Sequence, residues 1–126
     1  MAQLAGLLVE YETRRRFIPA EFVQRILRRV AISAVPGTPL GLTFYQGRVI
    51  SVLALGSHRD ELLVCDVQGE LVALSGLRVL ASGFFEAAAE GVRVDAQVVP
   101  AFDIVSEVAS WEQRFWSDVR PKGEQS

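Results

Sequence analysis

The sequence predicts a mainly β domain that ends in a single helix. Up to residue 102, short runs of β-branched and aliphatic residues are separated by turn-forming pairs such as Gln46-Gly47 and Gln68-Gly69. Helical spacing of apolar residues appears only after Asp103. With 126 residues, the chain is long enough to form one domain, or two small subdomains that share a core.

The N-terminal segment predicts a strand followed by a turn. Residues 7–12 alternate apolar with acidic side chains, which indicates a strand with one exposed face. Its turn is expected at Arg14–Arg16.

Residues 32–55, ISAVPGTPLGLTFYQGRVISVLAL, are the most informative segment of the chain. Pro36 and Pro39 each lack a backbone N–H, and each pushes the preceding residue out of the helical region. We therefore expect an extended crossing between strands, away from the middle of a sheet.

A hairpin is expected at the centre of this segment. Gln46-Gly47 separates two apolar runs, a pattern typical of a two-residue turn with the glycine at positive φ. Residues 48–55 form the strand that follows. Three of its side chains are expected in the core: Val49, Val52 and Leu53.

The second half of the chain predicts two more hairpins. Gly56–Asp60 forms a polar break, and residues 62–67 and 71–74 form strands joined at Gln68-Gly69. Residues 76–80 are expected to continue the same sheet. Residues 81–91, rich in Ala, Gly and Glu, form either a loop or one helical turn. The last hairpin comprises residues 92–94, a turn at Asp95-Ala96, and residues 97–102.

The C-terminal residues predict a helix over about 104–119. Asp103 is placed to cap it, and Ile104, Val108, Trp111 and Phe115 form one apolar stripe. Pro121 lies beyond its end. The stripe either packs on the β structure, which most such stripes do, or presents an aromatic anchor for a partner, made of Trp111, Phe115 and Trp116.

No catalytic or metal-binding pattern is evident in the sequence. Cys65 lies in an apolar run and is expected to be a small buried side chain in a reduced compartment. His58 is expected in a polar turn, without a base or nucleophile nearby in the sequence. Zinc-ligand spacing and a phosphate-binding loop are both missing. We therefore expect no enzyme activity, no cofactor and no metal.

Composition and charge favour a cytoplasmic protein. The sequence shows no secretory signal and no apolar run of the roughly twenty residues that a membrane span needs. Residues 1–50 carry a net charge of +4 and residues 51–126 one of −6, a dipolar distribution that can orient a partner.

A small nucleic-acid-binding β-barrel is one alternative. Its supporting feature is a group of six arginines within sixteen residues: Arg14, Arg15, Arg16, Arg25, Arg28 and Arg29. The acidic pI of about 5.4 and the lack of aromatic residues at stacking spacing argue against it. We therefore expect no nucleic-acid partner.

Residues 32–55 resemble the corresponding stretch of CheW-like domains, the adaptor modules of bacterial chemosensory arrays. The family pattern is Val-Pro-Gly-x-Pro, a glycine, then Asn-Leu-Arg-Gly-x-Val-x-Pro-Val-x-Asp-Leu. Here Val35-Pro36-Gly37, Pro39 and Gly41 open the pattern, and Phe44–Gly47 occupy the turn. A weak internal echo between residues 46–55 and 95–104 is consistent with two related subdomains.

The resemblance implies two small five-stranded barrels of the SH3-like kind, packed together, with a terminal helix. Residues 17–20 match the returning strand of the first hairpin, and residues 22–27 match the short turn and strand that follow. The resemblance also implies one domain over residues 1–120 and a disordered tail over 121–126. The implied function is a non-enzymatic adaptor that links the cytoplasmic tip of chemoreceptors, lying near the groove between the barrels, to the regulatory domain of a CheA-type histidine kinase. Recruitment to receptor arrays is part of that implication.

The implied partner-binding residues lie mainly at the hairpin turn. They are Phe44, Gln46, Gly47, Arg48, Arg25 and Pro36. Several polar positions of the pattern differ, since the turn asparagine is Phe44, the turn arginine is Gln46 and the strand aspartate is Ala54. Arg25 stands where the family has an acid. A second alternative is therefore a divergent adaptor that binds one partner, such as the receptor without the kinase.

Overall fold

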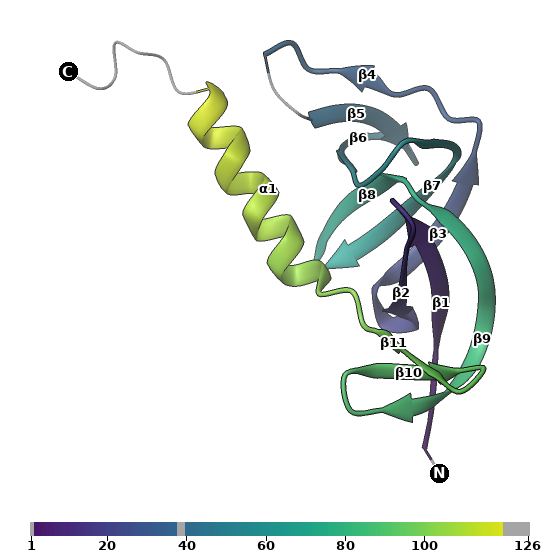
Figure 1. The fold of residues 1–126 in the computed structure, drawn as a ribbon. Helices are drawn as coiled ribbons and strands as arrows, with labels where there is room; N and C mark the ends of the chain where they lie inside the picture. Colours follow the sequence, from purple (N-terminus) through teal and green to yellow (C-terminus); the bar gives the residue numbers. More distant parts are fainter. Residues whose placement is uncertain (1, 38–39, 120–126) are drawn as a thin grey trace.

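The computed structural model describes residues 2–37 and 40–119, which form two β-sheets and one helix (Figure 1). The first sheet has the strand order β11-β10-β9-β1-β2, and the second has the order β3-β7-β8-β6-β5-β4. The elements are β1 (Gln3–Tyr11), β2 (Arg14–Pro19), η1 (Ala20–Phe22), β3 (Val23–Arg28), β4 (Ser33–Ala34), β5 (Leu40–Tyr45), β6 (Arg48–Ala54), β7 (His58–Val67), β8 (Glu70–Gly76), β9 (Arg78–Ala88), β10 (Gly91–Val94), β11 (Gln97–Pro100) and α1 (Ile104–Val119).

The first sheet combines the two ends of the described chain. β1 pairs with both β2 and β9, and the β10–β11 hairpin extends the sheet beyond β9. A parallel bridge between Phe17 and Ala101 joins the two outer strands, and the Phe102 N–H donates to the Phe17 carbonyl at 2.8 Å. The five strands thereby curl into a small barrel.

The second sheet is built from residues 23–76, between β2 and β9 of the first. Its strands are antiparallel except that β6 and β8 run parallel. It contains five longer strands and the two-residue edge strand β4. The expected mainly β architecture with two subdomains and a terminal helix is confirmed.

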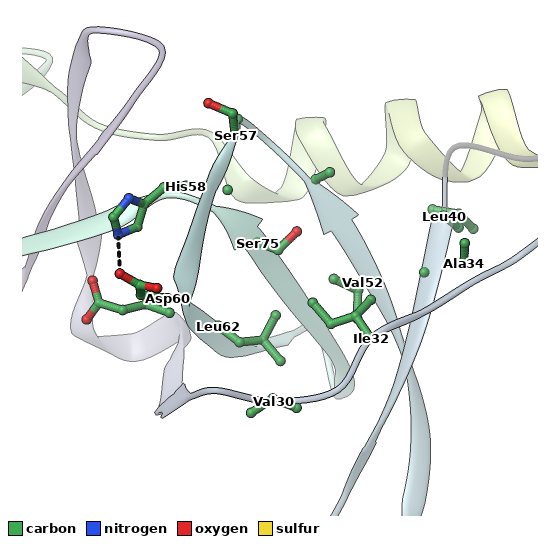
Figure 2. Close-up of a pocket in the computed structure, with 15 residues that line it drawn as sticks. Val30, Ile32, Ala34, Leu40, Val52, Ser57, His58, Asp60, Leu62 and Ser75 are labelled. Atoms are coloured by element: carbon green, nitrogen blue, oxygen red, sulfur yellow. Dashed lines mark ion pairs between the residues drawn. The ribbon is translucent and has the colours of Figure 1, made fainter.

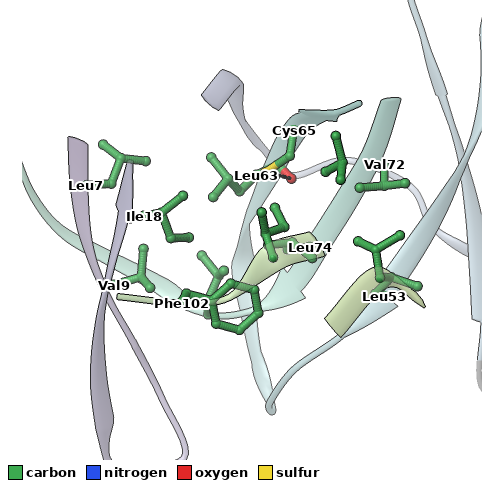
Figure 3. Close-up of a cluster of buried hydrophobic side chains, with 13 residues drawn as sticks. Leu7, Val9, Ile18, Leu53, Leu63, Cys65, Val72, Leu74 and Phe102 are labelled. Carbon is green, nitrogen blue, oxygen red and sulfur yellow. Dashed lines mark hydrogen bonds between the residues drawn. The ribbon is translucent and has the colours of Figure 1, made fainter. Parts of the chain in front are cut away.

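A large apolar cluster joins the two sheets and the start of the helix (Figure 3). Leu7 and Val9 come from the first sheet, Leu63 and Leu74 from the second, and Val108 from α1. Each sheet also has one smaller apolar cluster of its own, around Leu8 and Phe17 in the first sheet and around Val52 and Val64 in the second. Burying so many aliphatic side chains at one interface makes the sheets and the helix base a single packed unit.

β1 is buried on both faces over part of its length, which corrects the expected exposed face. Leu7 and Val9 join the cluster between the sheets, while Leu8 packs with Phe17 inside the first barrel. Simple alternation therefore fails here, because each face of the strand has a cover.

The two-residue turns explain most of the hairpins. Gln46 and Gly47 have φ values of 51° and 76°, and Gln68 and Gly69 have 53° and 87°. Two successive positive φ angles match the twist of the flanking strands. Both turns lie where the sequence predicts them.

The first hairpin corrects one expectation. Its turn is at Glu12-Thr13, with φ values of 51° and 65°, and Arg14–Arg16 already belong to β2. Glu12-Thr13 is a weaker turn signal than a pair that contains glycine, and the sequence therefore favours the three consecutive arginines as the polar break.

Residues 76–91 differ most from the prediction. The chain does not continue the second sheet after Gly76: it crosses at Leu77, and β9 then runs for eleven residues in the first sheet. Residues 81–88, expected to be part of a loop or a helical turn, therefore belong to a β-strand. Low β-propensity of Ala and Gly is overridden because β9 is held between β1 and β10.

The helix begins and ends close to the expected positions. The Asp103 carboxylate accepts from the Ser106 N–H at 3.2 Å, which is an N-cap contact. Ile104 and Val108 are buried, and Trp111 is half-buried against the main cluster. Within residues 2–37 and 40–119, no helix is long and apolar enough to span a membrane. The predicted tail over 121–126 lies outside the described residues.

Candidate partner-binding surfaces

Four of the six predicted partner-binding residues lie together at the β5–β6 hairpin. Phe44 is the second-last residue of β5, Gln46 and Gly47 form the turn, and Arg48 begins β6; all four are exposed. The Phe44 side chain is 73% exposed and pairs across the hairpin with Val49, which is 55% exposed. The burial of Val49 expected from the sequence is therefore wrong, whereas Val52 and Leu53 are buried as expected.

The other two predicted residues lie elsewhere. Arg25 is on β3, at the opposite edge of the second sheet from β4. Pro36 lies in the connection that precedes β5, at the far end of that strand from the Gln46-Gly47 turn. The structure therefore separates them from the hairpin turn.

The predicted aromatic anchor is only partly described. Trp111 packs half-buried against the main cluster, which supports the packing role of the stripe at this position. The side chains of Phe115 and Trp116 lie outside the described residues, and both positions belong to α1.

An apolar groove lies between the two sheets, on residues that the sequence did not single out. It has a volume of about 260 Å³ and is lined by β1, η1, the start of β3 and the middle of β9. Leu7 and Val23 form its walls, Ala5 and Ala20 add only short side chains, and Phe84 lies at its edge, 72% exposed. A large exposed aromatic beside an apolar pocket is typical of an interaction site.

Phe84 was missed because residues 81–91 could not be assigned to an element. Once β9 is in register with β1, Phe84 lies opposite Ala5 and on the same face as Ser82, beside the groove. The sequence signal that could have revealed it is the Phe84-Phe85 pair. Consecutive strand residues point to opposite faces, so one of two adjacent phenylalanines in a strand lies on the outer face. Phe85 accordingly packs inside the first barrel.

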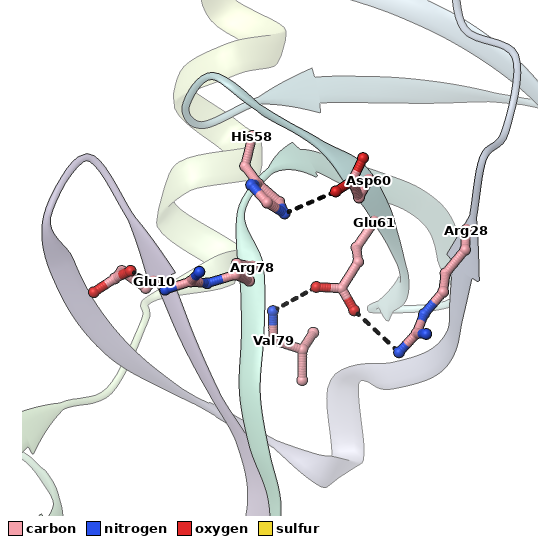
Figure 4. A network of polar contacts seen from close by, with 7 residues as sticks. All are labelled: Glu10, Arg28, His58, Asp60, Glu61, Arg78 and Val79. Atoms are coloured by element: carbon pink, nitrogen blue, oxygen red, sulfur yellow. Dashed lines mark hydrogen bonds and ion pairs between the residues drawn. The ribbon is translucent and has the colours of Figure 1, made fainter.

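A polar network fastens the junction between the sheets (Figure 4). The Glu61 carboxylate of β7 accepts from the Val79 N–H of β9 at 2.9 Å and lies 3.8 Å from the Arg28 guanidinium. Arg78 and Glu10 form an ion pair at 2.9 Å within the first sheet. Of these contacts, the Glu61–Val79 hydrogen bond joins the two sheets.

A larger cavity, of about 510 Å³, lies in the second sheet (Figure 2). His58, Asp60 and Ser57 stand at one end, and aliphatic side chains such as Val52 and Leu62 line the rest. His58 and Asp60 approach each other at 3.8 Å. No group of three or more metal-ligating side chains occurs among the described residues.

The single cysteine is not placed for catalysis. Cys65 is fully buried in the main cluster, and this burial raises the pKa of its thiol to about 12. A thiol with so high a pKa stays protonated near neutral pH and is a poor nucleophile. His58 lies at the other end of the same strand, β7.

These features define a two-sheet β domain with exposed aromatic side chains at a hairpin and beside a groove between the sheets. No protein-family model matches the sequence, and no curated protein matches it. Among solved structures, the fold is similar to that of the scaffolding protein TtCheW from Thermoanaerobacter tengcongensis, with a TM-score of 0.61 and 16% sequence identity. The match covers 79% of this chain and 88% of that one. The chain therefore has the CheW-like fold that residues 32–55 predict.

Proposed function

We propose that this protein is a cytoplasmic, non-enzymatic adaptor that binds the helical cytoplasmic tip of a chemoreceptor and, through a second surface, a CheA-type histidine kinase. The apolar groove between the sheets carries the proposal. An α-helix satisfies its own backbone hydrogen bonds, so it can lay apolar side chains into such a groove without leaving polar groups unpaired.

The groove also suits a partner that must be held at fixed geometry. Its walls come from β1 and β9 on one side and from η1 and β3 on the other. The Glu61–Val79 contact and the shared core hold those elements together. A preformed site loses little conformational entropy on binding.

The kinase is assigned to the second surface, the exposed β5–β6 turn with Phe44 and Arg48. Two observations support this assignment: residues 32–55 resemble the corresponding stretch of CheW-like domains, and the side chains of Phe44 and Arg48 are exposed. A divergent adaptor that binds the receptor alone is the second candidate, because Gln46 replaces the arginine of the family pattern and removes a fixed cationic donor.

Phe84→Glu tests the receptor site. The substitution should weaken binding of a purified receptor tip from the same organism at least tenfold, because a charge replaces an exposed aromatic contact. The thermal midpoint should change little, since Phe84 is largely exposed in the free protein. Isothermal titration calorimetry measures the affinity.

Phe44→Glu is the matched control, with the same change at an equally exposed phenylalanine on the other surface. It should leave receptor binding intact. Equal receptor binding by wild type and Phe84→Glu would exclude the groove as the receptor site.

A further inference from the structure

A second apolar groove lies between α1 and the second sheet, on a different part of the molecule from Phe84. Its volume is about 390 Å³. Its walls are aliphatic, with Leu40, Leu42 and Leu53 on the sheet and Val108 on the helix, and two carboxylates, Glu70 and Glu112, stand at it. A volume of 390 Å³ admits roughly two benzene-sized groups.

The groove continues into an exposed apolar strip on the β5–β6 hairpin. In the hairpin register, Leu40 faces Leu53, Leu42 faces Ser51, and Phe44 faces Val49. Directly opposed residues and residues two apart on one strand share a face of a sheet. Side chains from the floor of the groove out to Phe44 therefore lie on one surface. From Leu40 to Phe44 this surface extends for about 14 Å at roughly 3.4 Å per residue.

The two charged side chains that line this groove, Glu70 and Glu112, are both acidic. Glu70 begins β8 and Glu112 lies on α1, so the carboxylates come from different walls of the groove. Both residues are exposed, and neither makes an ion pair or side-chain hydrogen bond with any other side chain that the structure describes, a set that leaves out Arg59 and residues 114–119. A cationic group placed between them would be attracted electrostatically by both carboxylates.

We propose that this groove and strip bind an amphipathic helix of a partner protein, with aliphatic side chains on one face and lysine or arginine beside them. A helix of about nine residues is 14 Å long, which matches the strip. Its apolar side chains at positions i, i+4 and i+7 would meet the groove, the Leu42 region and Phe44 in turn.

The occupant is a helix and not an added strand, because the surface presents side chains only. β5 pairs with β6 along its length and with β4 at Gly41 and Leu42. A strand laid across this face would find no backbone partners, whereas a helix needs none. The chain's own residues 120–126, RPKGEQS, contain no large aliphatic or aromatic side chain to fill the groove.

This helix site does not depend on the proposed receptor contact, and it extends beyond the proposed kinase surface, with which it shares Phe44. The probe for a test is a fluorescein-labelled synthetic helix with leucine at i, i+4, i+7 and i+11 and lysine at the flanking positions. A peptide with glutamate in place of every lysine, and a scrambled leucine–lysine peptide, are the comparison ligands. Fluorescence anisotropy with the full chain measures their affinities.

The leucine–lysine helix should bind at least tenfold more tightly than either comparison peptide. Leu42→Asp should abolish binding, and Glu70→Lys/Glu112→Lys should reverse the preference toward the glutamate peptide. Glu21→Lys/Glu90→Lys, which makes the same charge change at two other exposed acids, should leave the preference unchanged.

Amide chemical-shift mapping locates the bound peptide, and circular dichroism confirms that each variant is folded. Perturbations along β5, β6 and the first half of α1 are expected. Equal binding of all three peptides, loss of preference with the Glu21/Glu90 control, or perturbations centred on Phe84 would each overturn the proposal. Phe84→Glu should not affect this peptide, so failure here and failure of the receptor site are distinguishable.

Discussion

Val49 and Leu53 lie four residues apart on the same face of β6, yet Val49 is 55% exposed and Leu53 is 3% exposed. The difference comes from what covers the strand. Leu53 lies in the main cluster with Leu74 and Val108, whereas Val49 lies near the turn, beyond that cluster. Local sequence predicts the face of a strand residue, and the distant helix decides its burial.

The two positions are expected to differ sharply in their contribution to stability. Leu53→Ala should lower the free energy of unfolding by about 2–5 kcal/mol, the range for a large-to-small change in a core. Val49→Ala should change it by less than about 0.5 kcal/mol. Urea denaturation of both variants checks this, and a Leu53→Ala cost as small as that of Val49→Ala would contradict the core placement.

Cys65 is expected to be chemically inert in the folded protein. Burial raises the pKa of its thiol to about 12, above the ordinary value of 9.0. Its contribution to stability is therefore complete below about pH 9 and is lost as the pH rises toward 12, because the unfolded thiol ionises first. Iodoacetamide at pH 8 should modify Cys65 only in denaturant, as measured by intact mass. Rapid modification of the native protein would show that the thiol is accessible.

At the scale of elements, the sequence predicts those parts whose structure is set locally. The Gln46-Gly47, Gln68-Gly69 and Asp95-Ala96 turns and the Asp103 cap are all confirmed, since each depends on residues within one or two positions. β9 is not predictable in this way. Its Ala- and Gly-rich residues become a strand because β1 and β10 supply partners from sequence positions far away.

Gly47 provides the test of a turn at element scale. Its φ is 76°, and a side chain added there would meet nothing within 4 Å, so only backbone strain opposes substitution. Gly47→Val should therefore destabilise the fold by roughly 1–2 kcal/mol. Gly47→Asn should cost much less, because asparagine tolerates this region. Thermal melts that coincide for the valine variant and wild type would contradict the turn geometry.

At the scale of the whole molecule, the proposed receptor and kinase surfaces differ in how far the sequence reveals them. The hairpin residues Phe44 to Arg48 follow from a local motif, and the structure keeps them together. The groove at Phe84 is assembled from β1, η1, β3 and β9, and only the folded chain brings these segments to one place. Arg25 and Pro36 show the converse, since the family resemblance assigned both to partner binding and neither lies at the hairpin turn.

Unequal binding of two partners is expected from this arrangement. The groove between the sheets is intact and apolar, while the hairpin carries Gln46 in place of a fixed cation. Losing one buried charged partner across an interface costs several kcal/mol, and each 1.4 kcal/mol weakens binding tenfold.

The receptor tip should therefore bind measurably and the kinase regulatory domain only weakly. Undetectable kinase binding would favour the divergent adaptor that binds the receptor alone. Gln46→Arg should strengthen kinase binding without altering receptor binding. Calorimetric titration of both variants with both partners decides the order of affinities, and tight kinase binding without receptor binding would reverse it.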